Sequence, residues 1–298
     1  MSDYDIPYWG VRTWIRGMIN YLKIMHRRRV VGYGEALKRI LWTLCDKRKK
    51  YNLYTIREKK TSDTIFLLGS GPSLNELTKG EMKTINTHDS FGMAYSILKE
   101  GITPTFYQPS YETTEDVSYF EKIFDEYRYS YRDTVFFIHL KHLFRFCHPR
   151  ISPLIFPENP EYCLYRQSDS IYLRGGETFT DKDFDRTLIY RNIMSLVIDL
   201  SVQMGYKKIV LVGVDLDKWE FFYKDYPEME QYMKRYDTER PEMKAGMKFD
   251  TMYPRECKAQ PFDNYLYSVA NYLKRKRGID LYIGKKDNML YPKLKAYF

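Results

Sequence analysis

The segment Thr64–Glu76 most constrains what this chain can fold into. Its apolar start, Thr64–Leu68, is typical of a buried strand, and the small residues of Gly69-Ser70-Gly71-Pro72-Ser73 then predict a tight turn. Ser73 stands three residues before Glu76, which is the spacing of a capping box at a helix start. A strand that turns into a capped helix presents backbone N–H groups and a positive dipole end, which suit a nucleotide phosphate. The simpler interpretation is a tight turn that holds no ligand.

The turn differs from the commoner phosphate-binding motifs. It lacks the Gly-Lys-Ser/Thr of a P-loop, and Leu74 stands where the dinucleotide-binding motif has its third glycine. After the turn, short apolar segments alternate with longer helical patterns. The expected strands are Thr64–Leu68, Thr105–Gln108, Thr134–His139, Ile209–Val212 and Asp280–Ile283, and the expected helices are Glu115–Tyr127, Leu188–Met204 and Phe262–Arg277. This alternation predicts a Rossmann-type α/β fold, a mostly parallel sheet with helices on both faces.

The positive charge of the chain is concentrated at its N-terminus. The net charge is +9, and residues 1–60 hold 15 Lys or Arg against 5 Asp or Glu. Two amphipathic patterns, Trp14–Met25 and Leu37–Leu44, alternate there with basic residues. We therefore expect a basic helical segment at 1–60 and a catalytic domain at 61–298. The segment either docks on an anionic membrane surface or caps the core with a solvated charged face. Nucleic acid is not an expected partner, because the rest of the chain lacks a basic face interleaved with aromatics.

Other features indicate the compartment. We find no apolar run of the length a membrane span needs and no apolar core of a signal peptide. The four cysteines lie far apart without a Cys-x-x-Cys pair, which favours reduced thiols over a zinc site. We expect a cytoplasmic protein that is peripheral on the inner face of the cell membrane.

A second predicted strand end carries two carboxylates. Asp215 and Asp217 follow the strand Ile209–Val212, and such a pair could hold a divalent metal against a sugar-nucleotide diphosphate. Alternatively, Asp215 bonds backbone groups of the turn, and Asp217 is left as a base or as surface charge. The polar segment from about 218 to 261 is either a lid over the site or a long surface excursion.

Three blocks resemble the bacterial sialyltransferases of glycosyltransferase family 42. They are Leu68–Leu74, Thr105–Ser110 and Gly205–Asp215, and their order and separations also agree. The resemblance spans Thr64 to Gly284 and implies a GT-A-like fold. It also implies inverting transfer from a CMP-activated acidic sugar without a metal cofactor. Pterin pyrophosphokinase-like proteins share the Gly-x-Gly-Pro-Ser turn and the Gly-x-Asp strand end, and are wider relatives.

The resemblance assigns residues to the nucleotide site. Those matched are Gly69, Ser70, Gly71, Pro72 and Ser73 in the turn, Gln108 where the family has an asparagine, Ser110, Asp215, and Tyr223 at the spacing of a phosphate-contacting tyrosine. Two departures concern the chemistry. Asp217 replaces a second such tyrosine, and no histidine follows His148, although the family places its base histidine in the lid. Because transfer to a hydroxyl needs a proton acceptor, Asp217, Asp250 and Glu256 are the candidate bases. His139, His142 and His148 follow another strand and are alternatives.

The predicted function is a glycosyltransferase that transfers a sugar such as sialic acid or Kdo from a CMP-linked donor. The expected acceptor is a cell-surface glycan or a lipid-linked one, as in lipopolysaccharide or capsule biosynthesis, at the cytoplasmic membrane face. A metal held by Asp215 and Asp217 would instead favour a UDP- or GDP-sugar. One alternative is a pyrophosphokinase-like phosphoryl-transfer enzyme that uses ATP and magnesium. Another is a membrane-docked nucleotide-binding protein without turnover, which the missing histidine favours.

Overall fold

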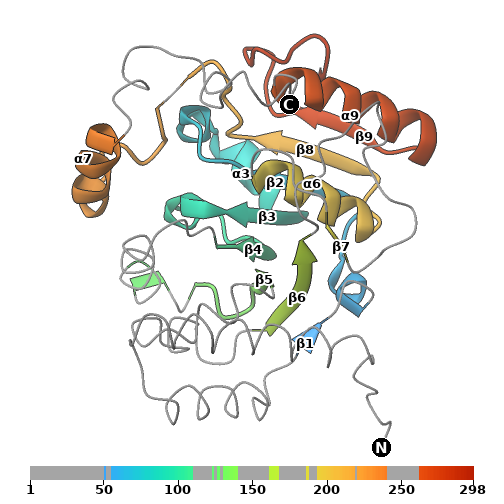
Figure 1. Cartoon of the computed structure of the whole chain (residues 1–298), viewed down its shortest axis with the longest axis horizontal. Helices are drawn as coiled ribbons and strands as arrows, with labels where there is room; N and C mark the ends of the chain where they lie inside the picture. Colours follow the sequence, from blue (N-terminus) through green and yellow to red (C-terminus); the bar gives the residue numbers. More distant parts are fainter. Residues whose placement is uncertain are drawn as a thin grey trace, which may run out of the picture.

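The described part of the chain is built around one parallel β-sheet (Figure 1). The computed structural model describes residues 50–51, 55–109, 123, 126–127, 130–139, 161–167, 186–187, 193–218, 220–239 and 262–298. The strands are β1 (Lys50–Tyr51), β2 (Thr64–Leu68), β3 (Asp89–Met93), β4 (Phe106–Gln108), β5 (Val135–His139), β6 (Glu161–Gln167), β7 (Arg186–Thr187), β8 (Lys208–Val212), β9 (Asp280–Ile283) and β10 (Lys295–Ala296). Their order is β1-β6-β5-β4-β3-β2-β8-β9-β10, with β7 beside β6, and every described pair is parallel.

Helices and short 3₁₀ turns connect these strands. The α-helices are α3 (Lys79–Asn86), α6 (Ile193–Gln203), α7 (Glu230–Glu239) and α9 (Phe262–Arg277), and the 3₁₀ helices are η1 (Thr55–Lys59), η2 (Pro72–Glu76), η3 (Ala94–Leu98) and η5 (Pro227–Met229). The predicted strands Thr64–Leu68 and Asp280–Ile283 and the predicted helix Phe262–Arg277 agree with β2, β9 and α9 at both ends. The predicted helix Glu115–Tyr127 lies largely outside the described residues.

Side chains of the central strands alternate between two cores, one on each face of the sheet. In β2, Ile65 and Leu67 pack with residues of α6 and α9, whereas Phe66 and Leu68 pack with α3 and the last two residues. A strand buried on both faces is continuously apolar, which explains why β2 was recognisable in the sequence. The expected Rossmann-type α/β fold with helices on both faces is confirmed.

The helix start after β2 differs from the prediction. The spacing of Ser73 and Glu76 predicts a capping box, but η2 begins at Pro72, and its N-cap residue, Gly71, provides no side-chain cap. The capping box lies five residues later, where the Thr78 hydroxyl accepts from the Glu81 N–H and Glu81 accepts from the Thr78 N–H. The reason is that the Ser73 N–H donates to another group, the Asp215 carboxylate. A capped α-helix therefore does not start directly at the glycine turn.

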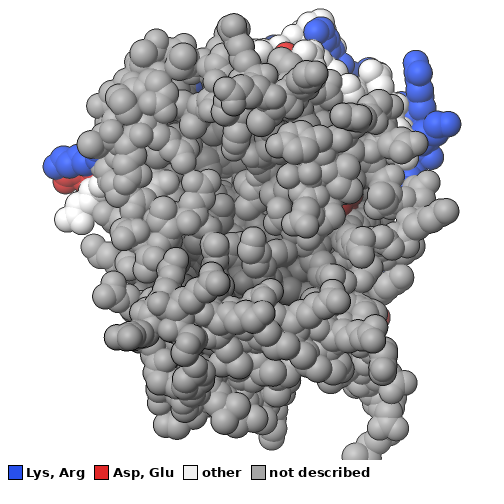
Figure 2. All heavy atoms as spheres, viewed as in Figure 1, with Lys and Arg blue, Asp and Glu red and all other residues white. Residues whose placement is uncertain are grey.

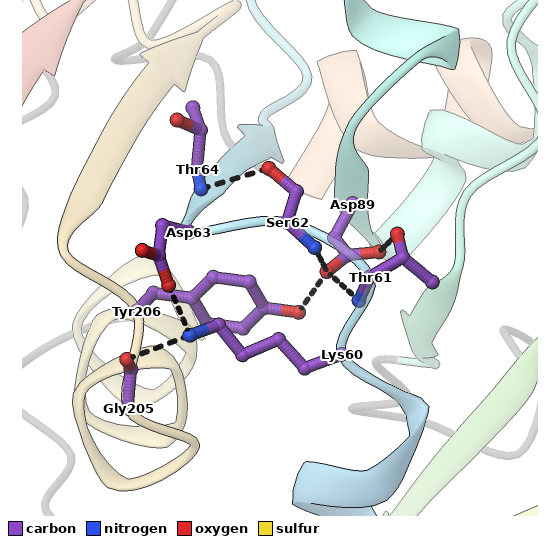
Figure 3. Close-up of polar contacts among 8 residues, drawn as sticks. All are labelled: Lys60, Thr61, Ser62, Asp63, Thr64, Asp89, Gly205 and Tyr206. Atoms are coloured by element: carbon purple, nitrogen blue, oxygen red, sulfur yellow. Dashed lines mark hydrogen bonds and ion pairs between the residues drawn. The ribbon is translucent and has the colours of Figure 1, made fainter.

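The amino ends of β2, β3 and β8 meet at a buried carboxylate (Figure 3). Asp89, which begins β3, is 1% exposed. Its carboxylate accepts from the N–H and hydroxyl of Thr61 (2.8 and 2.6 Å), from the Ser62 N–H (3.1 Å) and from the Tyr206 hydroxyl (2.7 Å). Burial, and then the charge of Asp89, raise the pKa of Tyr206 strongly. Asp89 therefore joins the segments that lead into three strands.

Of the predicted N-terminal segment 1–60, the structure describes only residues 50–51 and 55–60. Residues 1–49 lie outside the described residues, so the two amphipathic patterns are not seen. Within the predicted segment, β1 pairs with β6 and Ile56 of η1 is fully buried in the core. The chain thus joins the sheet before residue 60. No helix among the described residues has both the length and the apolar character that crossing a membrane requires.

Candidate functional site

The sheet has a topological switch point between β2 and β8, at the carboxyl ends of these two strands. From β2 the chain continues to β3 on one side, and β8 later pairs with β2 on the other side. In open parallel sheets, ligands bind in the crevice at such a switch point. The turn Gly69–Ser73 follows β2 and the segment Gly213–Asp215 follows β8, so two of the sequence blocks meet there (Figure 1).

The two glycines of the turn are required by close packing against the end of β8. The N–H groups of Gly69 and Gly71 donate to the carbonyls of Val212 and Gly213, both at 2.8 Å. A Cβ added at Gly69 would lie 2.2 Å from the Gly213 carbonyl oxygen, and one at Gly71 would lie 2.3 Å from Asp215 Oδ2. Only glycine fits at either position.

Asp215 is tied to the turn. Its Oδ2 accepts from the Ser73 N–H at 2.8 Å, and Asn288 Nδ2 lies 3.5 Å from its Oδ1. Burial raises the pKa of Asp215, against the opposing hydrogen bond from Ser73, and the charge of Asp217 raises it further. Of the two alternatives for the carboxylate pair, the structure therefore shows the one in which Asp215 bonds backbone of the turn. Within the described ranges, no group of three His, Cys, Asp or Glu side chains is placed to hold a metal.

The backbone of the turn is less open than the sequence predicts. The N–H groups of Gly69, Gly71 and Ser73 all donate inside the chain, and Pro72 has none. The expectation of a turn with free N–H groups is therefore wrong for these four residues. Ser70 differs from them: its carbonyl accepts from the Phe222 N–H at 3.0 Å, while its own N–H and hydroxyl have no partner among the described residues.

Gln108 lies at the carboxyl end of β4, two strands from β2. It is 4% exposed, and its Nε2 donates to the Pro109 carbonyl at 2.9 Å. Its Oε1 is buried and has no hydrogen-bond partner among the described residues. A buried acceptor that stays unpaired costs about 1–3 kcal/mol. Gln108 is thus a buried amide with one oxygen available to a donor from a ligand.

Tyr223 lies in an aromatic cluster beside the turn. It is 2% exposed, and its ring packs against those of Tyr95 and Phe221 with centroids at 5.2 and 5.1 Å. Asn75 of η2 donates to the Phe222 carbonyl at 2.7 Å, which holds the loop before η5 against the turn. This loop and α7 are the described part of the predicted lid.

Of the three candidate bases, only Asp217 lies among the described residues. Asp217 is exposed and lines a cleft beside the turn. Asp250, Glu256 and the predicted site residue Ser110 lie outside the described residues, as do His142 and His148. The structure therefore brings together the turn, Asp215 and Asp217, with Gln108 at the same edge of the sheet.

Sequence reasoning missed the contribution of the segment after β9. The cleft is lined by Ser73, Leu77, Leu211, Val212, Gly213, Asp215, Asp217, Lys218, Gly284, Lys285, Asp287 and Asn288. Asn288 donates to the Val214 carbonyl at 2.9 Å, and Lys285 donates to the Glu76 carbonyl at 2.5 Å. Both follow the carboxyl end of a predicted strand, so the rule that singled out Asp215 applies to them equally.

Comparison of the chain with family models and with curated proteins finds no match. Among solved structures, the chain is similar to a variant of the sialyltransferase CST-II in complex with CMP (TM-score 0.45, 17% identity, covering 78% of this chain and 86% of that one). It is also similar to the monofunctional α-2,3-sialyltransferase Cst-I from Campylobacter jejuni (TM-score 0.43, 14% identity, 80% and 82%). A third is CstII from Campylobacter jejuni with the substrate analogue CMP-3FNeuAc (TM-score 0.39, 16% identity, 78% and 84%). All three of these proteins are sialyltransferases.

Proposed function

We propose that this chain is a glycosyltransferase that takes its sugar from a CMP-linked donor bound at the switch point of the sheet. The observation that carries the proposal is the convergence of the three sequence blocks on one edge of the sheet. The turn Gly69–Ser73 and Asp215 are in contact at the ends of β2 and β8, and Gln108 ends β4. Residues at the ends of these strands lie where parallel sheets bind nucleotides.

Two groups at this edge can recognise a nucleotide. Gln108 Oε1 is a buried acceptor without a partner among the described residues, so it suits a hydroxyl or an amino group of the ligand. The N–H and hydroxyl of Ser70 are donors, and donors suit a phosphate oxygen. An acceptor for the nucleoside and donors for the phosphate together match a nucleoside monophosphate sugar.

Asp217 is the proposed base among the described residues. In the transfer, the acceptor hydroxyl oxygen bonds to the anomeric carbon while the bond from that carbon to the phosphate oxygen breaks. CMP leaves with the electron pair, and the hydroxyl proton passes to the Asp217 carboxylate. Asp217 is exposed at the cleft beside the turn, so an acceptor can reach it from solvent. Asp250 and Glu256 are the other candidates for this role.

The proposal also includes the transferred sugar, its acceptor and the place in the cell where transfer occurs. We propose sialic acid or Kdo as the sugar and a glycan or lipid-linked glycan as the acceptor. The proposed location is the cytoplasmic face of the membrane, with residues 1–60 on an anionic lipid surface. The excess of basic residues in that segment supports this placement.

Thermal-shift measurements with CMP, UDP, GDP and ATP, each with and without magnesium, test the nucleotide. We expect CMP to raise the melting temperature without magnesium. A shift by ATP with magnesium alone would overturn the proposal in favour of a pyrophosphokinase-like protein. No shift with any nucleotide would favour an interaction protein without turnover.

Gln108→Met sharpens this measurement. The substitution keeps the volume and removes both the unpaired buried oxygen and the Nε2 hydrogen bond to the Pro109 carbonyl, two effects of opposite sign, so the melting temperature of the free protein should change little, while the shift caused by CMP should be lost. The matched control is Thr134→Val. Thr134 is 1% exposed and its hydroxyl donates to the Pro104 carbonyl at 2.7 Å. This variant should lower the melting temperature and retain the CMP shift.

A further inference from the structure

The amino end of the sheet carries a patch of exposed basic side chains. Two of them, Lys207 and Lys208, lie at the start of β8, and four form the last turn of α9. The six residues, called the basic patch below, are Lys207, Lys208, Lys274, Arg275, Lys276 and Arg277, and all are exposed. Figure 2 shows Lys and Arg side chains gathered at the edge of the molecule where Figure 1 places the end of α9.

The fold brings these two segments together although they are more than sixty residues apart. Gly278 has a φ of +64°, a left-handed conformation that allows the chain to reverse directly after α9. The Asp280 N–H then donates to the Lys207 carbonyl at 2.9 Å, and Asp280 pairs in register with Lys208. The end of α9 therefore lies beside the start of β8.

Two carboxylates lie beside the basic patch. Asp280 lies 2.7 Å from Lys274 and so balances one member of the patch, whereas Asp63 lies 2.5 Å from Lys60, which is outside the patch. The hydrogen bond from Lys60 lowers the pKa of Asp63, and the charges of Lys207 and Lys208 lower it further. Outside residues 1–60 the chain has 33 basic and 34 acidic residues, yet this surface is strongly positive.

Helix stability explains only part of the basic patch. Lysine and arginine in a last helical turn interact favourably with the helix dipole, which accounts for the four residues of α9. Lys207 precedes β8 and Lys208 begins it, so neither interacts with the negative end of a helix dipole in this way. Lys207, Lys208, Arg275 and Lys276, four exposed cations from two separate segments on one surface, therefore indicate an anionic partner.

We propose that the basic patch docks on an anionic phospholipid membrane. Lysine and arginine near such a surface are attracted to its negative potential. Among the described residues, the only large hydrophobic side chain that is exposed is Tyr291, which follows β9 rather than preceding it. The basic patch therefore holds no aromatic side chain on which nucleic acid bases could stack and no apolar side chain that inserts into lipid. The binding is electrostatic and peripheral.

Docking through this surface orients the candidate site. The basic patch lies at the amino ends of β8 and β9, whereas the turn and Asp215 follow carboxyl ends. A five-residue strand spans about 17 Å. If the proposed function holds, the reacting sugar of the acceptor stands at least about that distance from the lipid headgroups, as the outer end of a long lipid-linked glycan would.

Vesicle co-sedimentation of the full chain tests the docking surface. The variant carries Lys207→Glu, Lys208→Glu, Arg275→Glu and Lys276→Glu. The matched control carries Lys79→Glu, Lys83→Glu, Lys224→Glu and Lys234→Glu, which changes the net charge equally on α3, on α7 and in the loop before η5. Vesicles of phosphatidylcholine with and without phosphatidylglycerol are compared at low and high salt.

We expect the wild-type chain to bind vesicles only when they contain phosphatidylglycerol, and salt to release it. Residues 1–60 are unchanged in both variants, so the comparison of the two isolates the basic patch: the basic-patch variant should bind these vesicles at least about tenfold more weakly than the control. Equal losses in both variants, or none in the basic-patch variant, would overturn the proposal. Tighter binding of the wild-type chain to duplex DNA or RNA than to these vesicles would also overturn it.

Hydrogen exchange of the wild-type chain provides a measurement that needs no substitution. On phosphatidylglycerol vesicles, peptides that cover the end of α9 and the start of β8 should exchange more slowly than in solution. Slower exchange confined to other peptides would place the membrane contact elsewhere. CMP binding is measured separately by thermal shift, so failure of the docking surface and failure of the proposed function are distinguishable.

Discussion

The amino and carboxyl ends of the central sheet each hold a carboxylate, and the two carboxylates differ in burial and in the number of hydrogen bonds they accept. At the amino end, Asp89 is almost fully buried and accepts four hydrogen bonds, from Thr61, Ser62 and Tyr206 (Figure 3). At the carboxyl end, Asp215 is half-buried, accepts one backbone hydrogen bond of 2.8 Å and has a raised pKa. The first carboxylate is saturated with donors, and the second has accepting capacity left.

This difference separates structural support from the candidate site. Buried polar groups that serve only the fold are hydrogen-bonded, because an unpaired group lowers the free energy of unfolding. At the carboxyl end, Gln108 Oε1 is buried without a partner among the described residues, and the donors of Ser70 are also unpartnered there. Gln108 and Ser70 thus have hydrogen-bonding capacity left at the end of the sheet where a ligand would supply the missing partners.

The largest expected effect is at the amino end. Asp89→Ala leaves four donors without their acceptor in a buried place, so the free energy of unfolding should fall by about 4 kcal/mol or more. Urea denaturation measures it. Asp89→Asn keeps the shape and one acceptor oxygen, and should lose less. A loss below about 1 kcal/mol for the alanine variant would show that water replaces the carboxylate there.

The next effect is at the carboxyl end and comes from packing. Gly69→Ala places a Cβ 2.2 Å from the Gly213 carbonyl oxygen, and because that neighbour is backbone it cannot rotate away. The free energy of unfolding should fall by about 3 kcal/mol. Gly80→Ala in α3 is the matched control, since its nearest neighbour would be Thr78 Oγ1 at 4.0 Å. That variant should be neutral or more stable by up to about 1 kcal/mol.

A smaller effect isolates the charge of Asp89. Tyr206→Phe removes a hydrogen bond of 2.7 Å to the carboxylate and should cost about 1.5 kcal/mol or more. Tyr131→Phe removes a hydrogen bond of 3.3 Å to the neutral Ile97 carbonyl, and should cost about 1 kcal/mol or less. Chemical denaturation of both variants gives the difference. Equal losses would contradict a special role for the carboxylate.

The same two ends show which features the sequence could predict. β2 and α9 have continuous local patterns, an apolar run and a helical repeat, so their bounds were predictable. β3 was missed because its sequence, Asp89-Ser90-Phe91-Gly92-Met93, begins with polar residues. The partners that bury Asp89 lie 28 and 117 residues away, at Thr61 and Tyr206, and no local pattern indicates them.

At the candidate site, residues were easier to predict than their contacts. Gly69, Gly71 and Asp215 stood out because strand ends are where ligands bind, and the structure brings them together. Their hydrogen bonds were not predictable. Whether the Ser73 N–H caps a helix or faces a ligand depends on Asp215, 142 residues away, whose carboxylate takes that donor.

The smallest expected effect is a pH dependence whose sign differs between the two ends. The pKa of Asp215 is raised above its ordinary value of 3.8, so between that value and the raised one the folded chain binds more protons than the unfolded chain. Its contribution to the free energy of unfolding therefore falls as pH rises through this window, and Asp215→Asn should remove that fall. Asp63, at the amino end, has a lowered pKa, so its contribution is lost as pH falls, and Asp63→Asn should remove that loss. Urea denaturation from acid to neutral pH measures both slopes. If both substitutions change the slope of the wild-type chain in the same direction, Asp215 is held as a stabilised anion, and the contrast between the two ends fails.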